Sequence, residues 1–162
     1  MRFFVVAMLQ SLYHDAMMTA RDIESVICFT VPLLVPTTNH YKKPTHYTGR
    51  DGYQHLGFAL TKEAKLYREA VAIFAQGRTV APQTDKDRRK AKYTVQMDVF
   101  LGPKQRLDSD NALKVGIDSL VWCGVIHSDA NVYESKAIIH KDERENPENP
   151  RTQYLITRME KE

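Results

Sequence analysis

The order of hydrophobic and polar positions along the chain predicts four β-strands. The clearest signal lies in residues 93–101, where Val95, Met97 and Val99 alternate with mostly polar residues. Residues 26–35 form a run of Val, Ile, Phe and Leu typical of a buried strand, and its prolines end the strand early or place it at a sheet edge. The four predicted strands are residues 26–35, 93–101, 131–141 and 153–159.

Two further segments have a helical period. Apolar residues recur at helical spacing from Thr61 to about Gln76, and Gly77 ends that helix. A second helix follows residues 107–110 and ends before Gly124, where a left-handed residue is expected just past the helix end. The two apolar stripes consist of Ala64, Tyr67, Val71 and Phe74, and of Leu113, Ile117, Leu120 and Val121.

The remaining segments are polar. Residues 40–58 are predicted to be a mobile loop rich in aromatic residues, residues 78–92 a charged linker, and residues 142–151 an exposed loop before the last strand. The element order is therefore β-loop-α-β-α-β-β. This order predicts a single α+β domain over residues 23–162, in which a mixed β-sheet packs with two main helices.

Residues 1–22 form an N-terminal extension whose role the sequence leaves open. Its short apolar run has a weak likeness to a signal peptide, but it lacks a clear cleavage site and is too short to span a membrane. Two interpretations remain: Met17 or Met18 is the natural start, or the segment is an additional helix.

Composition and charge narrow the class of protein only in part. The 162 residues are 43% hydrophobic and 27% charged, which is typical of a soluble globular domain. The formal net charge of +3 is too small to indicate a nucleic-acid partner by itself. Cys28 and Cys123 lie far apart without a metal-ligand spacing, so we expect buried, reduced thiols in an intracellular protein.

The candidate catalytic residues are concentrated around the second predicted helix, mainly at its start. Asp108 and Asp110 lead into this helix, Lys114 lies one turn after Asp110, and Asp129 follows the helix. If the three acids converge at the helix mouth, their mutual repulsion calls for a cation, and carboxylate oxygens suit Mg²⁺. Such an ion polarises a phosphoryl oxygen and helps to generate hydroxide, while a lysine neutralises developing charge.

Taken alone, the Asp-Ser-Asp-Asn sequence at residues 108–111 is more often a helix cap than a metal site. Asp, Ser and Asn are favoured helix N-cap residues, and acids in a first turn complement the helix dipole. Asp110 and Lys114 have the spacing of an ordinary surface pair, and Asp129 alone is a common turn residue. Spacing alone does not decide between capping and metal binding.

The combination of these residues resembles the RusA family of Holliday junction resolvases. The match runs through Asp108-x-Asp110-Asn111-x-x-Lys114, Asp118-x-Leu120, Gly124 and Asp129-Ala130-Asn131-Val132. It extends over roughly Ile27 to Met159. Two departures are Ser128, where many members carry an acid, and Ala112, where leucine is commoner; neither removes a catalytic acid.

The resemblance implies a homodimeric, Mg²⁺-dependent endodeoxyribonuclease of recombination and repair, with Mn²⁺ as a possible substitute ion. Asp108, Asp110 and Asp129 correspond to the catalytic, metal-binding acids, and Lys114 to a lysine needed for activity. The substrate would be branched DNA, a four-way junction resolved by paired symmetric nicks. A cytoplasmic, nucleoid-associated location follows, without a membrane or small-molecule cofactor, and members are often carried by phages or prophages.

Basic and aromatic residues outside the acid cluster are candidates for DNA contact. Lysine and arginine neutralise phosphates, and aromatic rings stack on unpaired bases. The alternative interpretation is that these residues are ordinary solvated surface positions, and that Asn39 and Tyr41 belong to a plain turn. The candidates are Asn39, Tyr41, Lys42, Lys43, Arg50, Lys62, Arg68, Lys104 and Arg106.

Two other functions stay open at this point. The first is a junction-binding module of the same fold that does not cleave, which Ser128 slightly favours. The second is a metal-binding domain without a nucleic-acid partner. Zinc is not expected, because His40, His46 and His55 have irregular spacing and no accompanying cysteine.

Overall fold

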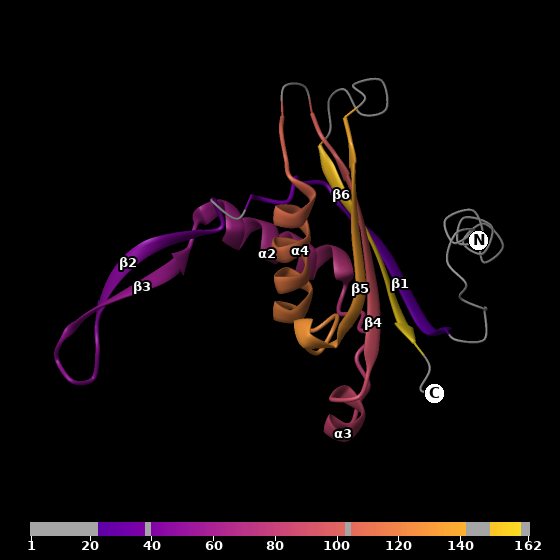
Figure 1. Cartoon of the computed structure of the whole chain (residues 1–162), viewed down its shortest axis with the longest axis horizontal. Helices are drawn as coiled ribbons and strands as arrows, with labels where there is room; N and C mark the ends of the chain where they lie inside the picture. Colours follow the sequence, from indigo (N-terminus) through magenta and orange to yellow (C-terminus); the bar gives the residue numbers. More distant parts are fainter. Residues whose placement is uncertain (1–22, 38–39, 103–104, 142–149, 160–162) are drawn as a thin grey trace.

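The four predicted strands form one mixed sheet, as seen in the computed structural model of the chain (Figure 1). The structure describes residues 23–37, 40–102, 105–141 and 150–159. The sheet order is β1-β6-β4-β5, with β4 parallel to β5 and the other neighbours antiparallel. The strands span Ile23–Val31 (β1), Lys92–Phe100 (β4), Val132–His140 (β5) and Arg151–Met159 (β6).

Two helices cover one face of this sheet, as predicted. They are α2, Lys62–Ala75, and α4, Ser109–Trp122 (Figure 1). Thr61 caps α2 by accepting a hydrogen bond from the Ala64 amide, and Gly124 takes the expected left-handed conformation, with φ of 76°. The α+β class, the order of the main elements and both helix ends are therefore confirmed.

The buried face of α4 differs from the predicted one. Leu113, Ile117 and Val121 are only partly buried, whereas a neighbouring stripe with smaller residues faces the sheet. The reason is close approach: a Cβ added at Gly116 would lie 2.3 Å from the Met97 sulfur of β4. A helix this close to the sheet buries small side chains. The buried stripe is Ala112, Val115, Gly116, Ser119 and Leu120.

Residues 40–58 are not a loop, which corrects the prediction. Strands Lys42–Thr48 (β2) and Gln54–Leu60 (β3) pair as an antiparallel hairpin, which projects from the body of the molecule (Figure 1). Gly52 lies in the hairpin turn and takes a left-handed conformation there, with φ of 80°. We refer to residues 42–60 as the arm.

Some further details differ from the predictions, and two predicted segments lie outside the described residues. The linker over 78–92 contains a short helix, α3, at Asp85–Arg88. Cys28 is exposed and Cys123 only partly buried, so the expectation of two buried thiols is wrong. Residues 1–22 and the acidic loop at 142–149 lie outside the described residues. Among the helices described, none is long and apolar enough to cross a membrane.

Candidate metal-binding half-sites

The first candidate half-site lies where α4 begins. Asp108 is the N-cap of this helix, and its side chain accepts a hydrogen bond of 3.3 Å from the Asp110 amide. Asp108, Asp110 and Lys114 are all exposed. The capping interpretation of Asp108 is thus confirmed, but a carboxylate cap uses one oxygen and leaves the other available to a ligand.

The second half-site follows the other end of α4. Asp129 opens a 3₁₀ turn, η3, at Asp129–Asn131, and the Ala130 amide donates to its carboxylate at 2.9 Å. Ser128, at the position where many RusA-like proteins carry an acid, caps this turn. The Asn131 amide group donates to the Ala91 carbonyl at 2.7 Å, which fixes the turn beside the start of β4.

The two half-sites therefore lie at opposite ends of one helix. The 14 residues of α4 span about 21 Å, and Asp108 comes after β4 ends while Asp129 lies near where β4 begins (Figure 1). The expectation that three acids meet at one helix mouth within a chain is wrong. No three acidic, histidine or cysteine residues among those described lie close enough together to hold a metal.

The acids of both half-sites face solvent without a cationic partner. Within the described part of the chain, no lysine, arginine or histidine forms an ion pair with Asp108, Asp110 or Asp129. Carboxylate oxygens are ligands that hard divalent cations such as Mg²⁺ prefer. Each half-site by itself supplies too few of them for a firm site.

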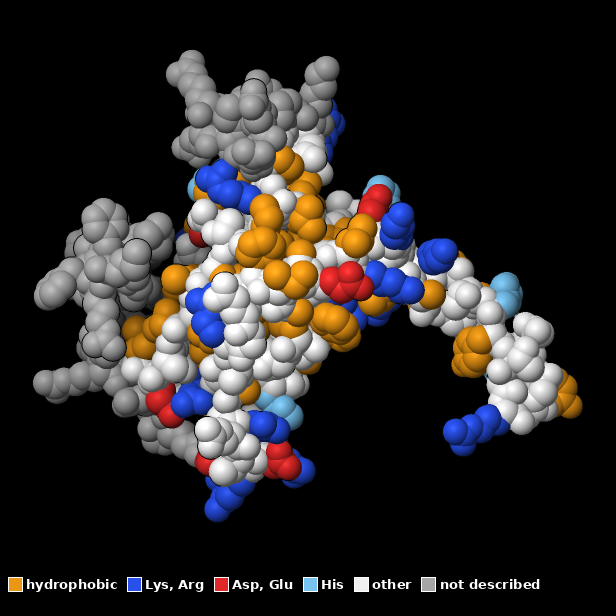
Figure 2. Space-filling view, turned by 180° about the vertical axis from the view of Figure 1, so that it is seen from behind, with side chains coloured by type: hydrophobic (Ala, Val, Ile, Leu, Met, Phe, Trp, Pro, Cys, Tyr) orange, Lys and Arg blue, Asp and Glu red, His pale blue; other side chains and the backbone are white. Residues whose placement is uncertain are grey.

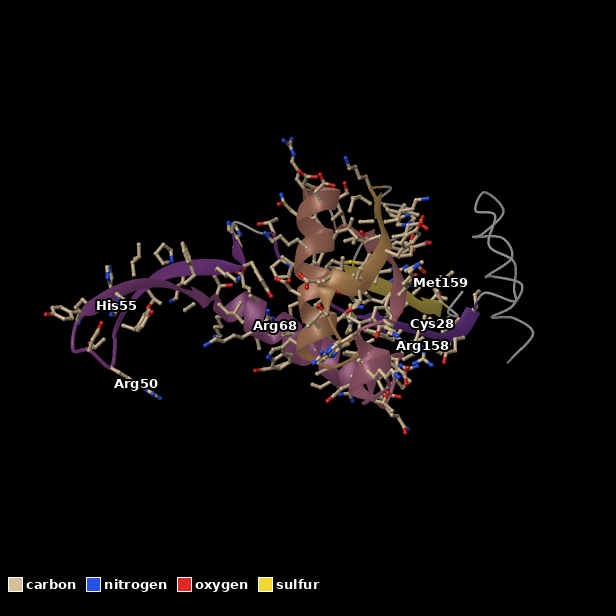
Figure 3. All side chains as sticks on the ribbon, turned by 60° about the horizontal axis from the view of Figure 1, so that its bottom comes forward. Cys28, Arg50, His55, Arg68, Arg158 and Met159 are labelled. Atoms are coloured by element: carbon tan, nitrogen blue, oxygen red, sulfur yellow. The ribbon has the colours of Figure 1, made fainter. Side chains whose placement is uncertain are left out.

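The candidate DNA contacts fall into two groups. Lys42, Lys43 and Lys62 are exposed at the root of the arm, and Arg50 is exposed at its tip (Figure 3). Arg106 is exposed just before the first half-site. These five positions are free to meet a phosphate backbone. Asn39 and Lys104 lie outside the described residues.

Tyr41 and Arg68 are engaged inside the protein instead. Tyr41 is only 3% exposed, and Arg68 of α2 donates a hydrogen bond to its hydroxyl. The Arg68 guanidinium lies 5.2 Å from the Tyr41 ring centre and 5.8 Å from that of Trp122 on α4. Burial raises the pKa of Tyr41, partly offset by the nearby Arg68. This cluster joins the arm root to both helices, and Tyr41 is not placed to stack on a base.

The sequence interpretation missed the exposed apolar residues of the arm and α2. Leu56 and Phe58 on β3 are 65% and 70% exposed, and Ile73 on α2 is 68% exposed. The alternation of Leu56, Phe58 and Leu60 was a strand signal that the surrounding polar residues obscured.

No protein-family model matches the chain, and no curated protein matches it either. The functional argument therefore depends on these residues and their geometry.

Proposed function

We propose that this protein is a Mg²⁺-dependent endodeoxyribonuclease that cleaves four-way DNA junctions as a homodimer. The observation that carries the proposal is the pair of solvent-facing acidic half-sites at the two ends of α4. The motif resemblance to the RusA family also supports the proposal, and the type of reaction and the substrate are inferred from that resemblance.

A two-fold dimer resolves the separation of the half-sites. If the α4 helices of two copies lie antiparallel across a two-fold axis, Asp108 and Asp110 of one copy face Asp129 of the other. The same operation creates a second, identical site, as symmetry requires. A four-way junction has approximate two-fold symmetry, so two equivalent sites suit two symmetric nicks.

The roles of the residues follow from their chemistry. Asp108, Asp110 and the second copy's Asp129 would hold the cation, which when bound polarises the scissile phosphate and lowers the pKa of a water ligand. Lys114, exposed one turn along α4, would neutralise charge developing on the phosphate. Lys42, Lys43, Arg50, Lys62 and Arg106 would bind the DNA backbone and make binding salt-dependent.

Cleavage of a synthetic four-way junction tests this proposal. The protein with Mg²⁺ should introduce symmetric nicks in opposed strands, leave a linear duplex intact, and lose cleavage in Asp110→Asn. Glu69→Gln, which alters an exposed acid on α2 outside the half-sites, is the matched control and should still cleave. Tight binding to the junction without nicks by the unaltered protein would instead identify a non-cleaving junction-binding module.

A further inference from the structure

One face of the arm is apolar and uncovered. The register pairs Pro44 with Phe58 and His46 with Leu56, and side chains paired in this way lie on the same face of the hairpin. Leu56 and Phe58 on this face are 65% and 70% exposed. The arm stands clear of the body in both views (Figures 1 and 2), so the described body of the chain does not cover this face.

The opposite face of the arm is partly engaged by its own side chains. Tyr47 stacks on His55 with 5.5 Å between ring centres, and a Cβ added at Gly57 would lie 2.9 Å from a ring carbon of Tyr47. The two rings of this face therefore already contact each other, whereas Leu56 and Phe58 present their side chains to solvent.

Charge along the arm is positive at both ends. Lys42 and Lys43 are exposed at the root, and Arg50 is exposed at the tip (Figure 3). Asp51 is the one acid in residues 42–60, and His55 lies 3.0 Å from its carboxylate. Apolar side chains between cationic ends match the chemistry of DNA, in which phosphates flank the flat faces of the bases.

The arm is fixed on the side of the sheet that carries α4. Figure 1 shows that it projects from the side on which α2 and α4 lie. The Thr61 amide donates a hydrogen bond of 3.1 Å to the Tyr41 carbonyl at the arm root. Arg68 contacts both the Tyr41 ring and Trp122 of α4. DNA that lies along α4 therefore meets the arm on the same side of the molecule.

We propose that the arm recognises the branch point of the DNA by inserting Leu56 and Phe58 against bases that are unstacked there. A two-stranded ribbon fits the major groove, which is about 12 Å wide, and each strand of the arm has seven residues and is about 23 Å long. Proteins that kink DNA insert leucine and phenylalanine between base steps in this way. Lys42, Lys43 and Arg50 hold the flanking phosphates.

The energetic reason is the cost of unstacking. A base inside a continuous duplex is stacked on both sides, whereas a base at a branch point has lost part of its stacking and leaves the stack at lower cost. The two-stranded arm is itself marginally stable alone in water, so packing against bases also stabilises it. Insertion by the arm therefore favours branched DNA over a linear duplex.

This inference deepens the proposed function, and it rests on that function for the choice of branched DNA as ligand. Junctions that carry 2-aminopurine at the branch point test it without Mg²⁺, so that cleavage does not enter. The emission of this base analogue rises when it leaves the stack. The unaltered protein should raise the emission at the branch point and not within a linear duplex. Leu56→Thr combined with Phe58→Thr should abolish the rise.

Ile73→Thr is the matched control, because it removes an apolar side chain that is 68% exposed on α2 rather than on the arm. It should keep the rise in emission. Threonine has a high strand propensity, so the arm should still form in the double variant, and circular dichroism checks that the fold is retained. Phe58→Trp, which keeps a large ring at the same position, should also keep the rise.

Affinity separates the inserted side chains from the phosphate contacts. In fluorescence anisotropy at one salt concentration, the Leu56→Thr, Phe58→Thr variant should bind the junction about tenfold more weakly and the linear duplex equally well. Arg50→Ala should weaken both complexes to a similar extent and reduce the dependence of affinity on salt. An unchanged junction affinity in the double variant would overturn the proposal, as would an equal loss on the duplex.

The remaining outcomes distinguish this inference from the proposed nuclease. Arm-dependent unstacking by a protein that makes no nicks with Mg²⁺ would uphold the inference and refute the nuclease. Symmetric nicking by the Leu56→Thr, Phe58→Thr variant at the rate of the unaltered protein would do the reverse. A protein that binds no DNA, and whose mass changes in the arm variant, would overturn the inference and identify the arm as a protein-binding surface.

Discussion

Asp108 has two roles in this account, and a single substitution separates them. As N-cap of α4 it accepts a hydrogen bond from the Asp110 amide, and as a half-site acid it would bind the cation. Serine caps a helix about as well as aspartate but has no carboxylate.

We therefore expect Asp108→Ser to keep the free energy of unfolding within about 0.5 kcal/mol and to lose junction cleavage. Asp108→Ala should lose cleavage and also about 1 kcal/mol of stability, because the amide loses its acceptor. Urea unfolding and a nicking assay measure the two effects. Full cleavage by the serine variant would leave Asp108 with the capping role alone.

Arg68 has a structural role that depends on where the fold places its side chain. Arg68 was a candidate DNA contact, whereas its guanidinium contacts Tyr41 and Trp122. These contacts could not be predicted from the sequence, because Tyr41 and Trp122 are distant from Arg68 along the chain and only the fold brings them together.

Arg68→Ala should lower the free energy of unfolding by about 1–3 kcal/mol, because the buried Tyr41 loses the charged donor to its hydroxyl and the Tyr41 and Trp122 rings lose their cation–π partner. Lys65→Ala, on the exposed side of the same helix, should change stability by less than about 0.5 kcal/mol. Denaturant titration compares the two; equal effects would show that the Arg68 contacts contribute nothing.

At the scale of elements, periodicity predicted the main strands and helices, but it assigned the wrong stripe of α4 to the core and failed at the arm, where no core exists. The strands β4 and β6, and the ends of α2 and α4, follow from alternation, caps and Gly124. The arm was missed because neither of its faces is buried. Its first strand has no alternating apolar residues, and the alternation of Leu56, Phe58 and Leu60 in its second strand follows a long polar segment.

Contacts between elements add a dependence on pH. Tyr67 of α2 and Tyr154 of β6 share a buried hydrogen bond of 2.7 Å, and burial raises the pKa of both above the ordinary value of 10.0. The folded state therefore holds these protons more tightly than the unfolded chain does. The stability that these two protonated phenols contribute is fully present below pH 10 and is lost as the pH rises above that value.

Thermal unfolding at increasing alkaline pH should show this loss, and Tyr67→Phe should make it shallower by removing one of the two phenols. Tyr53→Phe, which alters a phenol 72% exposed on the arm, should leave the profile unchanged. A profile equally steep in Tyr67→Phe would mean that other groups cause the alkaline loss.

At the scale of the whole molecule, the motif indicates which residues form the site, and the fold shows where in space they lie. Spacing in the sequence identified Asp108, Asp110, Lys114 and Asp129 and predicted the helix between the acids, but it could not show that Asp129 stays at the far end of that helix. Linear spacing carries no information on whether a site closes within one chain or between two. The split arrangement is what makes a dimer central to the proposed nuclease.

Mixing two inactive variants tests that central claim most directly. Asp110→Asn and Asp129→Asn homodimers should each fail to nick a four-way junction. In a mixed dimer, the intact Asp108 and Asp110 of the Asp129→Asn chain face the intact Asp129 of the other chain, so one complete site is restored.

The account predicts that co-refolded mixtures of the two variants recover nicking in one strand of each junction. Asp110→Asn mixed with itself serves as the control and should stay inactive. If the three acids instead acted within one chain, both sites of the mixed dimer would be defective. A mixture that forms mixed dimers yet leaves the junction intact would contradict the account.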